Sequence, residues 1–145
     1  MQEQHYYTIE EADTLLQEID ANMRQTHRLI KRLIGNGMDE EDVYECIDDC
    51  LEEEESIEEY EFLAENPAAK QAMNKILRLI NDILDHDVHI QDLDLGLVDF
   101  PSWFQGREVH LCHKLGEDRI RHWHEVDSGF RGRQPIFEID VMMDE

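Results

Sequence analysis

The sequence predicts an α+β protein, in which an antiparallel helical hairpin or three-helix arm precedes a small antiparallel β module of three or four strands. Up to about residue 85, apolar residues recur at alternating steps of four and three, which is typical of helices packed along a seam. After residue 87, apolar and polar residues alternate, which is typical of strands with one buried face. We therefore expect residues 1–87 to form the arm and residues 88–145 the β module, packed together as one domain.

The first helix is expected at about residues 9–34. Thr8 and Glu11 have the spacing of a capping box, in which each side chain accepts a hydrogen bond from the amide of the other residue. Gly35 and Gly37 should end the helix. The residues expected to form its seam are Ala12, Leu16, Ile19, Met23, Thr26, Ile30 and Leu33.

A second helix is expected at about residues 39–65, with Asp39 as its cap. This segment contains 15 acidic residues and no lysine or arginine. Because like charges one turn apart repel, we expect the middle of this helix to be its weakest part. Its expected seam residues are Val43, Ile47, Cys50, Glu54, Ile57, Glu61 and Ala64.

The third helix is expected at about residues 67–85, since Asn66 and Pro67 form a favourable helix start. Short connections between the helices favour antiparallel neighbours. Long seams in so small a chain resemble a coiled coil and leave apolar edges to cover. We therefore expect a homo-oligomer, such as a homodimer, or a protein partner docked on the helices. The seam residues of this helix are Ala69, Met73, Ile76, Ile80 and Ile83.

The β module should begin with an extended run that Pro101 breaks. Residues 107–114 and 119–126 then read as two strands joined by the turn 115–118. Residues 128–135 form a loop that contains glycine and arginine.

The charge balance excludes several classes of function. The chain has 36 Asp and Glu against 13 Lys and Arg, a net charge of −23, which repels nucleic acids and anionic membrane surfaces. The N-terminus lacks the basic and apolar segments of a secretion signal. Three cysteines without a CxxC pair cannot form a closed disulfide framework. We therefore expect a soluble, cytoplasmic protein.

Residues 88–136 contain several short motifs: Gly96-Leu97-Val98-Asp99-Phe100-Pro101, Gly106-Arg107-Glu108-Val109, Leu115-Gly116-Glu117, Trp123-His124 and Gly129-Phe130-Arg131-Gly132-Arg133-Gln134-Pro135-Ile136. In these motifs the chain resembles a prokaryotic domain family of unknown function, DUF2203, and the helices resemble it more loosely. The resemblance implies a small soluble bacterial protein and brings no established activity.

Three histidines of the predicted hairpin suggest a metal site. A short turn at residues 115–118 would place His113, His122 and His124 on one face, because side chains alternate along each strand. Three imidazoles can hold zinc or another divalent transition metal with one open position, as in a metal-dependent hydrolase or hydratase. A bound water would then be the nucleophile, and Arg133 would steady an anionic substrate. The alternative is that these histidines bond to nearby carboxylates or backbone groups.

The glycine and arginine loop suggests an anion site. Arg131 and Arg133 supply positive charge, while Gly129 and Gly132 allow backbone amides to turn inward, which suits a phosphate or carboxylate. The alternative is that both arginines clamp the loop onto carboxylates of the helical arm.

The sequence context of the cysteines favours a role in packing over a role in catalysis or redox chemistry. Cys46 and Cys50 lie one helical turn apart near a seam, with no cation nearby in the sequence to activate a thiolate. Cys112 and His110 are two apart on one strand and do not suit nucleophilic geometry. We therefore interpret the chain first as an interaction or regulatory protein. The alternatives are a metal-dependent enzyme and a module that binds a small anion.

Overall fold

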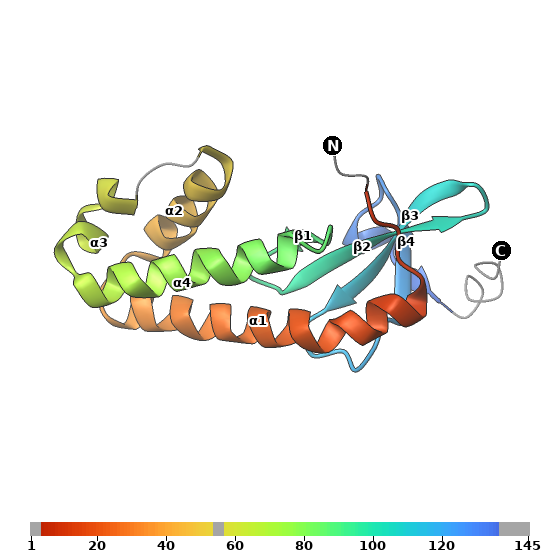
Figure 1. The fold of residues 1–145 in the computed structure, drawn as a ribbon, viewed down its shortest axis with the longest axis horizontal. Helices are drawn as coiled ribbons and strands as arrows, with labels where there is room; N and C mark the ends of the chain where they lie inside the picture. The colour runs from red at the N-terminus through yellow and green to blue at the C-terminus, as the bar shows by residue number, and fades with distance from the viewer. Residues whose placement is uncertain (1–3, 54–56, 137–145) are drawn as a thin grey trace. The chain divides into compact units, whose positions relative to one another are not determined.

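The computed structural model describes residues 4–53 and 57–136. Helices come first along the chain and strands second (Figure 1), which confirms the predicted α+β class. The chain divides into two compact units, residues 22–82 and residues 1–21 together with 83–145. No helix in the described part of the chain combines the length and the apolar character that crossing a bilayer requires.

Helix α1 (Ile9–Gly35) begins with the predicted capping box. The Thr8 amide donates to Oε1 of Glu11 at 2.9 Å, and the Glu11 amide donates to Oγ1 of Thr8 at 3.1 Å. The helix ends within one residue of the predicted position. All seven predicted seam residues are buried, namely Ala12, Leu16, Ile19, Met23, Thr26, Ile30 and Leu33.

The prediction of one continuous helix over residues 39–65 is wrong. The segment contains α2 (Glu40–Glu53), a single 3₁₀ turn η1 (Ile57–Glu59) and a short helix α3 (Glu61–Glu65). Tyr60 between the last two is extended, with φ −93° and ψ 113°. This break lets Ile57 and Leu63 be buried while Glu61 stays exposed, whereas one straight helix would turn Glu61 towards the core at the cost of desolvating its charge. The predicted seam position Glu54 lies outside the described residues, and Ala64 is exposed.

Helix α4 (Pro67–Leu84) agrees with the predicted third helix. Its five seam residues are buried, namely Ala69, Met73, Ile76, Ile80 and Ile83. Within residues 22–82, Nδ2 of Asn22 on α1 donates to the Leu79 carbonyl on α4 at 3.3 Å. Cys46 on α2 is fully buried, and burial is the main cause that raises the pKa of its thiol to about 12, followed by the neighbouring Cys50. That environment fits the expected packing role.

The sheet has five antiparallel strands in sequence order, where three or four were expected: β1 (His89–Asp92), β2 (Leu97–Phe104), β3 (Arg107–Lys114), β4 (His122–Glu125) and the two-residue β5 (Gln134–Pro135). Pro101 does not break the run, because β2 continues through it to Phe104. The Pro101 carbonyl accepts from the Tyr7 amide at 2.7 Å. The Pro101 nitrogen therefore faces an edge where β1 no longer pairs, and its missing N–H leaves no strand partner unsatisfied.

The two faces of the sheet differ in chemistry. The N-terminal segment and α1 contact one face, where the Tyr7 ring lies 5.3 Å from that of Phe100 and Asp20 lies near His113. Pairing of β2 with β3 places Asp99 opposite Cys112, and both residues belong to the other face. That second face, which we call the polar face, carries the groups described next.

Candidate functional site

The pairing of β3 with β4 decides which side chains meet. His110 lies opposite His124 and Cys112 lies opposite His122, so these four residues share the polar face. His113 belongs to the opposite face, and the predicted register is wrong by one residue. A shift of one residue moves every side chain of a strand to the other face.

The connection between the two strands explains the shift. Gly116 turns with φ 106°, and the Ile120 amide then donates to Oδ1 of Asp13 on α1 at 2.7 Å. This bond draws residues 119–121 away from β3, so that β4 begins at His122 instead of at residue 119. The turn is therefore longer than the four-residue turn that we expected.

Four buried side chains on the polar face form what we call the buried cluster: Asp99, His110, Cys112 and His124. Oδ1 of Asp99 lies 3.0 Å from Nε2 of His124, and Oδ2 of Asp99 lies 3.4 Å from Nδ1 of His110. The ligand atoms of Asp99, Cys112 and His124 all lie within 4.8 Å of one another. Each of the four residues exposes 7% or less of its surface.

Acceptors outside the cluster hold both imidazoles. Nδ1 of His124 lies 2.7 Å from the Glu125 carbonyl, and Nε2 of His110 lies 3.2 Å from Oε2 of Glu108. In each ring one nitrogen is thus engaged outside the cluster while the other faces Asp99. The two rings are 5.5 Å apart in an edge-to-face arrangement.

The loop after β4 lies on the polar face. Gly129 lies close to Gln91 on β1, since a Cβ at Gly129 would be 3.1 Å from Nε2 of that side chain. Two strands separate β4 from β1, so the loop must cross a face of the sheet to reach it. Its Arg133 contacts His122 on the polar face, which places the loop on that face.

The charges of the buried cluster are mutually dependent. Burial acts to lower the pKa of His124, but hydrogen bonds with Asp99 and Cys112 outweigh burial and raise that pKa to about 10. Burial acts to raise the pKa of Asp99, yet the close approach of His110 and the hydrogen bond from His124 bring it below its usual value. The pKa of His110 is raised by Asp99 and Glu108 against the opposing effect of burial. Without a bound ion, the cluster therefore contains an ionised Asp99 paired with a protonated His124 at neutral pH.

The structure does not bring the three predicted metal ligands together. His122 and His124 share the polar face, while His113 is fully buried on the other face. Nε2 of His113 lies 2.8 Å from the Glu117 carbonyl, and its Nδ1 lies 3.7 Å from Oδ1 of Asp20. The Glu117 contact is the backbone bonding that we gave as the alternative for these histidines, while the Asp20 carboxylate lies too far from Nδ1 for a hydrogen bond.

Arg133 binds a carboxylate of the protein itself. Its Nη2 atom lies 2.9 Å from both carboxylate oxygens of Glu117 and 2.6 Å from Nδ1 of His122. The guanidinium also lies over the ring of Phe130. Burial acts to raise the pKa of Glu117, but bonds from the Lys114 amide and Arg133 lower it overall. The arginine therefore acts as a clamp, with a partner in the β3–β4 connection instead of the helical arm.

The other predicted anion-binding groups do not converge. The Gly132 amide donates to the Gly129 carbonyl at 3.0 Å within a 3₁₀ turn, η2 (Phe130–Gly132), so it is engaged inside the loop. The Arg131 side chain is exposed. The Gly132 and Arg133 amides are therefore both engaged within the loop.

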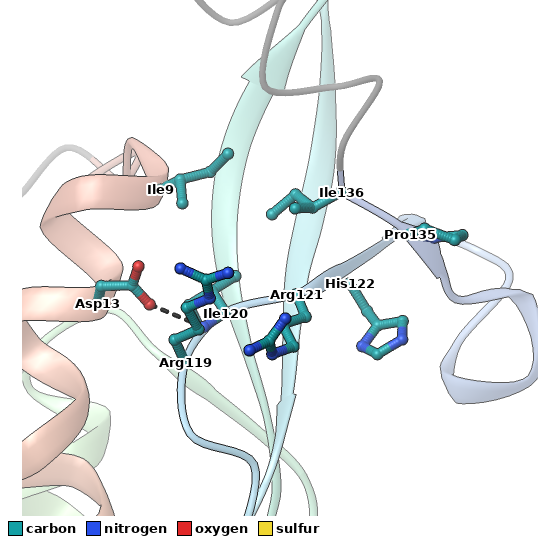
Figure 2. A pocket seen from close by; sticks show the side chains of 8 residues that line it. All are labelled: Ile9, Asp13, Arg119, Ile120, Arg121, His122, Pro135 and Ile136. Atoms are coloured by element: carbon teal, nitrogen blue, oxygen red, sulfur yellow. Dashed lines mark hydrogen bonds between the residues drawn. The ribbon is translucent and has the colours of Figure 1, made fainter.

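A pocket of about 500 Å³, which we call the arginine pocket, opens beside the start of β4 (Figure 2). The Arg119 and Arg121 side chains come from the segment that enters β4, as Figure 2 shows. Arg121 makes a bidentate bond with Asp118 at 2.8 and 3.0 Å, which lowers the pKa of Asp118 to about 2. Burial and then the charge of Arg133 lower the pKa of His122, so this imidazole is neutral at pH 7. The remaining lining residues are Ile9, Asp13, Ile120, Pro135 and Ile136.

Sequence reasoning missed three members of the buried cluster and the arginine pocket. Asp99 stands between Val98 and Phe100 in a strand that is otherwise apolar, and a buried carboxylate needs a partner. That signal could have marked Asp99 as part of a site. His110 and Cys112 were placed on the wrong face relative to His124 because the register was wrong by one.

Comparison with known proteins gives one match. The family model described as an uncharacterised conserved protein, DUF2203, matches residues 5–136. Neither the curated proteins nor the solved structures include a significant match. The match covers most of the chain and both the helices and the sheet. The chain therefore belongs to the DUF2203 family.

Proposed function

We propose that this protein binds a small organic anion in the arginine pocket. The observation that carries the proposal is Arg119, which makes no hydrogen bond or close ion pair with any residue that the structure describes, although its charge acts on the neighbouring Asp118. In a chain with 36 acidic residues, an arginine beside a pocket has many carboxylates available to it. Its guanidinium instead remains available to pair with a carboxylate or phosphate in two parallel hydrogen bonds.

The walls of the pocket favour an anion with an apolar body. Ile9, Ile120, Pro135 and Ile136 supply apolar surface beside the two arginines. A volume of about 500 Å³ is in the range of small-molecule sites. Burial of apolar ligand surface would add to the charge interaction, which alone is weak in open solvent. The pocket therefore suits a phosphate or carboxylate attached to a hydrocarbon group better than an inorganic ion.

Two further groups support this assignment. Arg121 is held in orientation by Asp118, and so adds a positioned guanidinium to the pocket. Nδ1 of the neutral His122 accepts a hydrogen bond from Arg133. The proton of the ring is therefore on Nε2, and Nε2 can donate a hydrogen bond to a ligand. Arg133 is thus a positioning residue behind the pocket.

The test is a titration of the full chain with phenyl phosphate, with inorganic phosphate as the comparison, followed by amide chemical shifts. We expect saturable shifts at residues 119–122 and 135–136, tighter binding of phenyl phosphate, and at least tenfold weaker binding by Arg119→Gln. Arg24→Gln is the matched control, because Arg24 is an exposed arginine of α1 outside the pocket lining. Equal binding by Arg119→Gln and the unchanged protein would refute the proposal.

Self-association or docking through the helices stays a prediction. The seam residues from which we derived it, such as Ile30 and Ile76, are buried within the chain and already have partners there. The apolar edges that would demand a partner are therefore smaller than expected. Sedimentation velocity over a range of protein concentrations measures this directly, and a monomer at every concentration would contradict it.

A further inference from the structure

We propose that the buried cluster is a metal centre, in which Asp99, Cys112 and His124 bind one divalent transition ion such as zinc and His110 supplies a fourth ligand. Asp99, Cys112 and His124 come from β2, β3 and β4, and their ligand atoms lie within 4.8 Å of one another. Ligand atoms of a tetrahedral zinc site are about 3.3–3.8 Å apart, as follows from zinc bond lengths of 2.0–2.3 Å. Contraction of these three ligand atoms by about 1 Å would bring them to that spacing, and Nδ1 of His110, 3.4 Å from Oδ2 of Asp99, would be the fourth donor.

The donor set suits zinc in both type and charge. A thiolate and imidazoles are typical ligands of zinc and its neighbours in the first transition row, and a carboxylate completes many such sites. One divalent ion with the Asp99 carboxylate, the Cys112 thiolate and two neutral imidazoles has a total charge of zero. Neutrality matters here because all four residues are buried and an uncompensated charge would be costly.

The outer contacts of both histidines match those of metal ligands. Histidine ligands usually donate their second ring nitrogen to a carboxylate or a backbone carbonyl, which fixes the ring and the tautomer. His124 meets the Glu125 carbonyl in this way at 2.7 Å, and His110 meets the Glu108 carboxylate at 3.2 Å. The nitrogens left over, Nε2 of His124 and Nδ1 of His110, are those that face Asp99.

An unsatisfied atom points independently to a missing ligand. Nδ1 of His110 is buried and forms no well-aligned hydrogen bond with any described residue, and the His110 side chain is only 8% exposed. Buried polar atoms without a partner are rare in native proteins and need an explanation. A metal ion between His110 and Asp99 would satisfy this atom and replace the long 3.4 Å approach of the two side chains.

The position of the centre indicates a structural role. Four protein ligands and a fully buried location leave no open coordination position for a substrate. An ion at this point would join three adjacent strands and stabilise the folded chain by its binding energy. The proposed centre therefore differs from the hydrolase or hydratase site expected from the histidines alone, in both its ligands and its role.

The test uses the full chain without a histidine tag, stripped of metal and titrated with cobalt(II). We expect one equivalent to bind, to give the absorption of a cobalt–thiolate bond, and to raise the melting temperature. Cys112→Ser should abolish that absorption, while Cys46→Ser is the matched control and should retain it, because Cys46 lies on α2 outside the cluster. Glu108→Gln should weaken cobalt binding by about 10- to 100-fold through the His110 ring.

Two results would overturn the proposal. One is a folded, metal-free protein that shows neither cobalt–thiolate absorption nor a change in melting temperature with excess cobalt. The other is absorption that is lost in Cys46→Ser and retained in Cys112→Ser. Circular dichroism of each variant shows whether it is folded, and Arg119→Gln should bind cobalt normally, which separates this proposal from the one on the arginine pocket.

Discussion

Asp99 on β2 and His124 on β4 reach across the intervening strand β3 to within 3.0 Å of each other. They pass between two residues of that strand, His110 and Cys112, which belong to the same face. A single pair of side chains thus links β2 to β4 across β3. Because the pair is buried, its loss affects the sheet far more than the loss of a surface ion pair would.

We expect Asp99→Asn to destabilise the metal-free protein by about 3–5 kcal/mol, since it leaves the His124 charge buried without its partner. The double variant Asp99→Leu/His124→Leu should be less destabilised than either single leucine variant, because it removes both charges. Urea unfolding in the presence of a chelator measures all these free energies. A double variant whose loss equals the sum of the single losses would show that the pair does not interact.

The clamp between Glu117 and Arg133 predicts a dependence of stability on pH. The pKa of Glu117 is lowered in the folded chain, so its contribution is present above the usual glutamate pKa of about 4.3 and is lost as the pH falls through the lowered value. Glu117→Gln should therefore cost about 2 kcal/mol at pH 7, and the difference from the unchanged protein should shrink below pH 4.

Urea unfolding from pH 3 to pH 8 measures this difference. Glu65→Gln provides the control, because Glu65 is exposed and should show little difference at any pH. A Glu117→Gln deficit that is the same at pH 3 and pH 7 would contradict the ion pair as its cause.

Removal of the helix cap should lower the stability of α1. Thr8→Ala deletes the hydroxyl that accepts from the Glu11 amide, and we expect a loss of about 1 kcal/mol. Thr14→Ala removes a hydroxyl of the same helix that bonds only to the Glu10 carbonyl one turn back, so it should change stability by less than about 0.5 kcal/mol. Chemical denaturation compares the two, and equal losses would argue against a cap at Thr8.

The loop after β4 should not tolerate a side chain at Gly132. A Cβ there would lie 2.5 Å from Oγ and 2.6 Å from Cβ of Ser128, closer than any normal contact. Gly132→Ala should therefore destabilise the chain by about 1–3 kcal/mol, and Ser128→Gly in the same chain should restore part of that loss. Thermal unfolding of Gly132→Ala, Ser128→Gly and the double variant measures this. If Ser128→Gly restores none of the loss, the contact with Ser128 is not the cause of the destabilisation.

Local patterns in the sequence predicted the helices better than they predicted the site. The seam of α1 follows from the helical period, which involves only neighbouring residues, and Ile19 and Met23 are buried as expected. The break at Tyr60 depends on which face of the acidic segment meets the rest of the unit, and the sequence does not encode this locally. The same limit applies more strongly to strands.

Alternation predicts that a strand has two faces, but it does not say which residues of two strands are opposite. The register of β3 and β4 depends on the contact of Asp13 with the Ile120 amide, a pair separated by 107 residues. For that reason the sequence predicts His113 and His124 on one face, whereas the structure places them on opposite faces. The partners of Asp99 could not be found until that register was known.

The N-terminal segment has a consequence for how the sheet meets other molecules. The Tyr7 amide bonds to the Pro101 carbonyl, and Oγ of Ser102 bonds to the Tyr7 carbonyl at 2.6 Å, so this segment occupies the free edge of β2 beyond β1. An unpaired strand edge is a template for intermolecular pairing and aggregation. Tyr7 therefore covers part of this edge, and we expect a chain shortened to begin at Thr8 to expose it and to aggregate more readily.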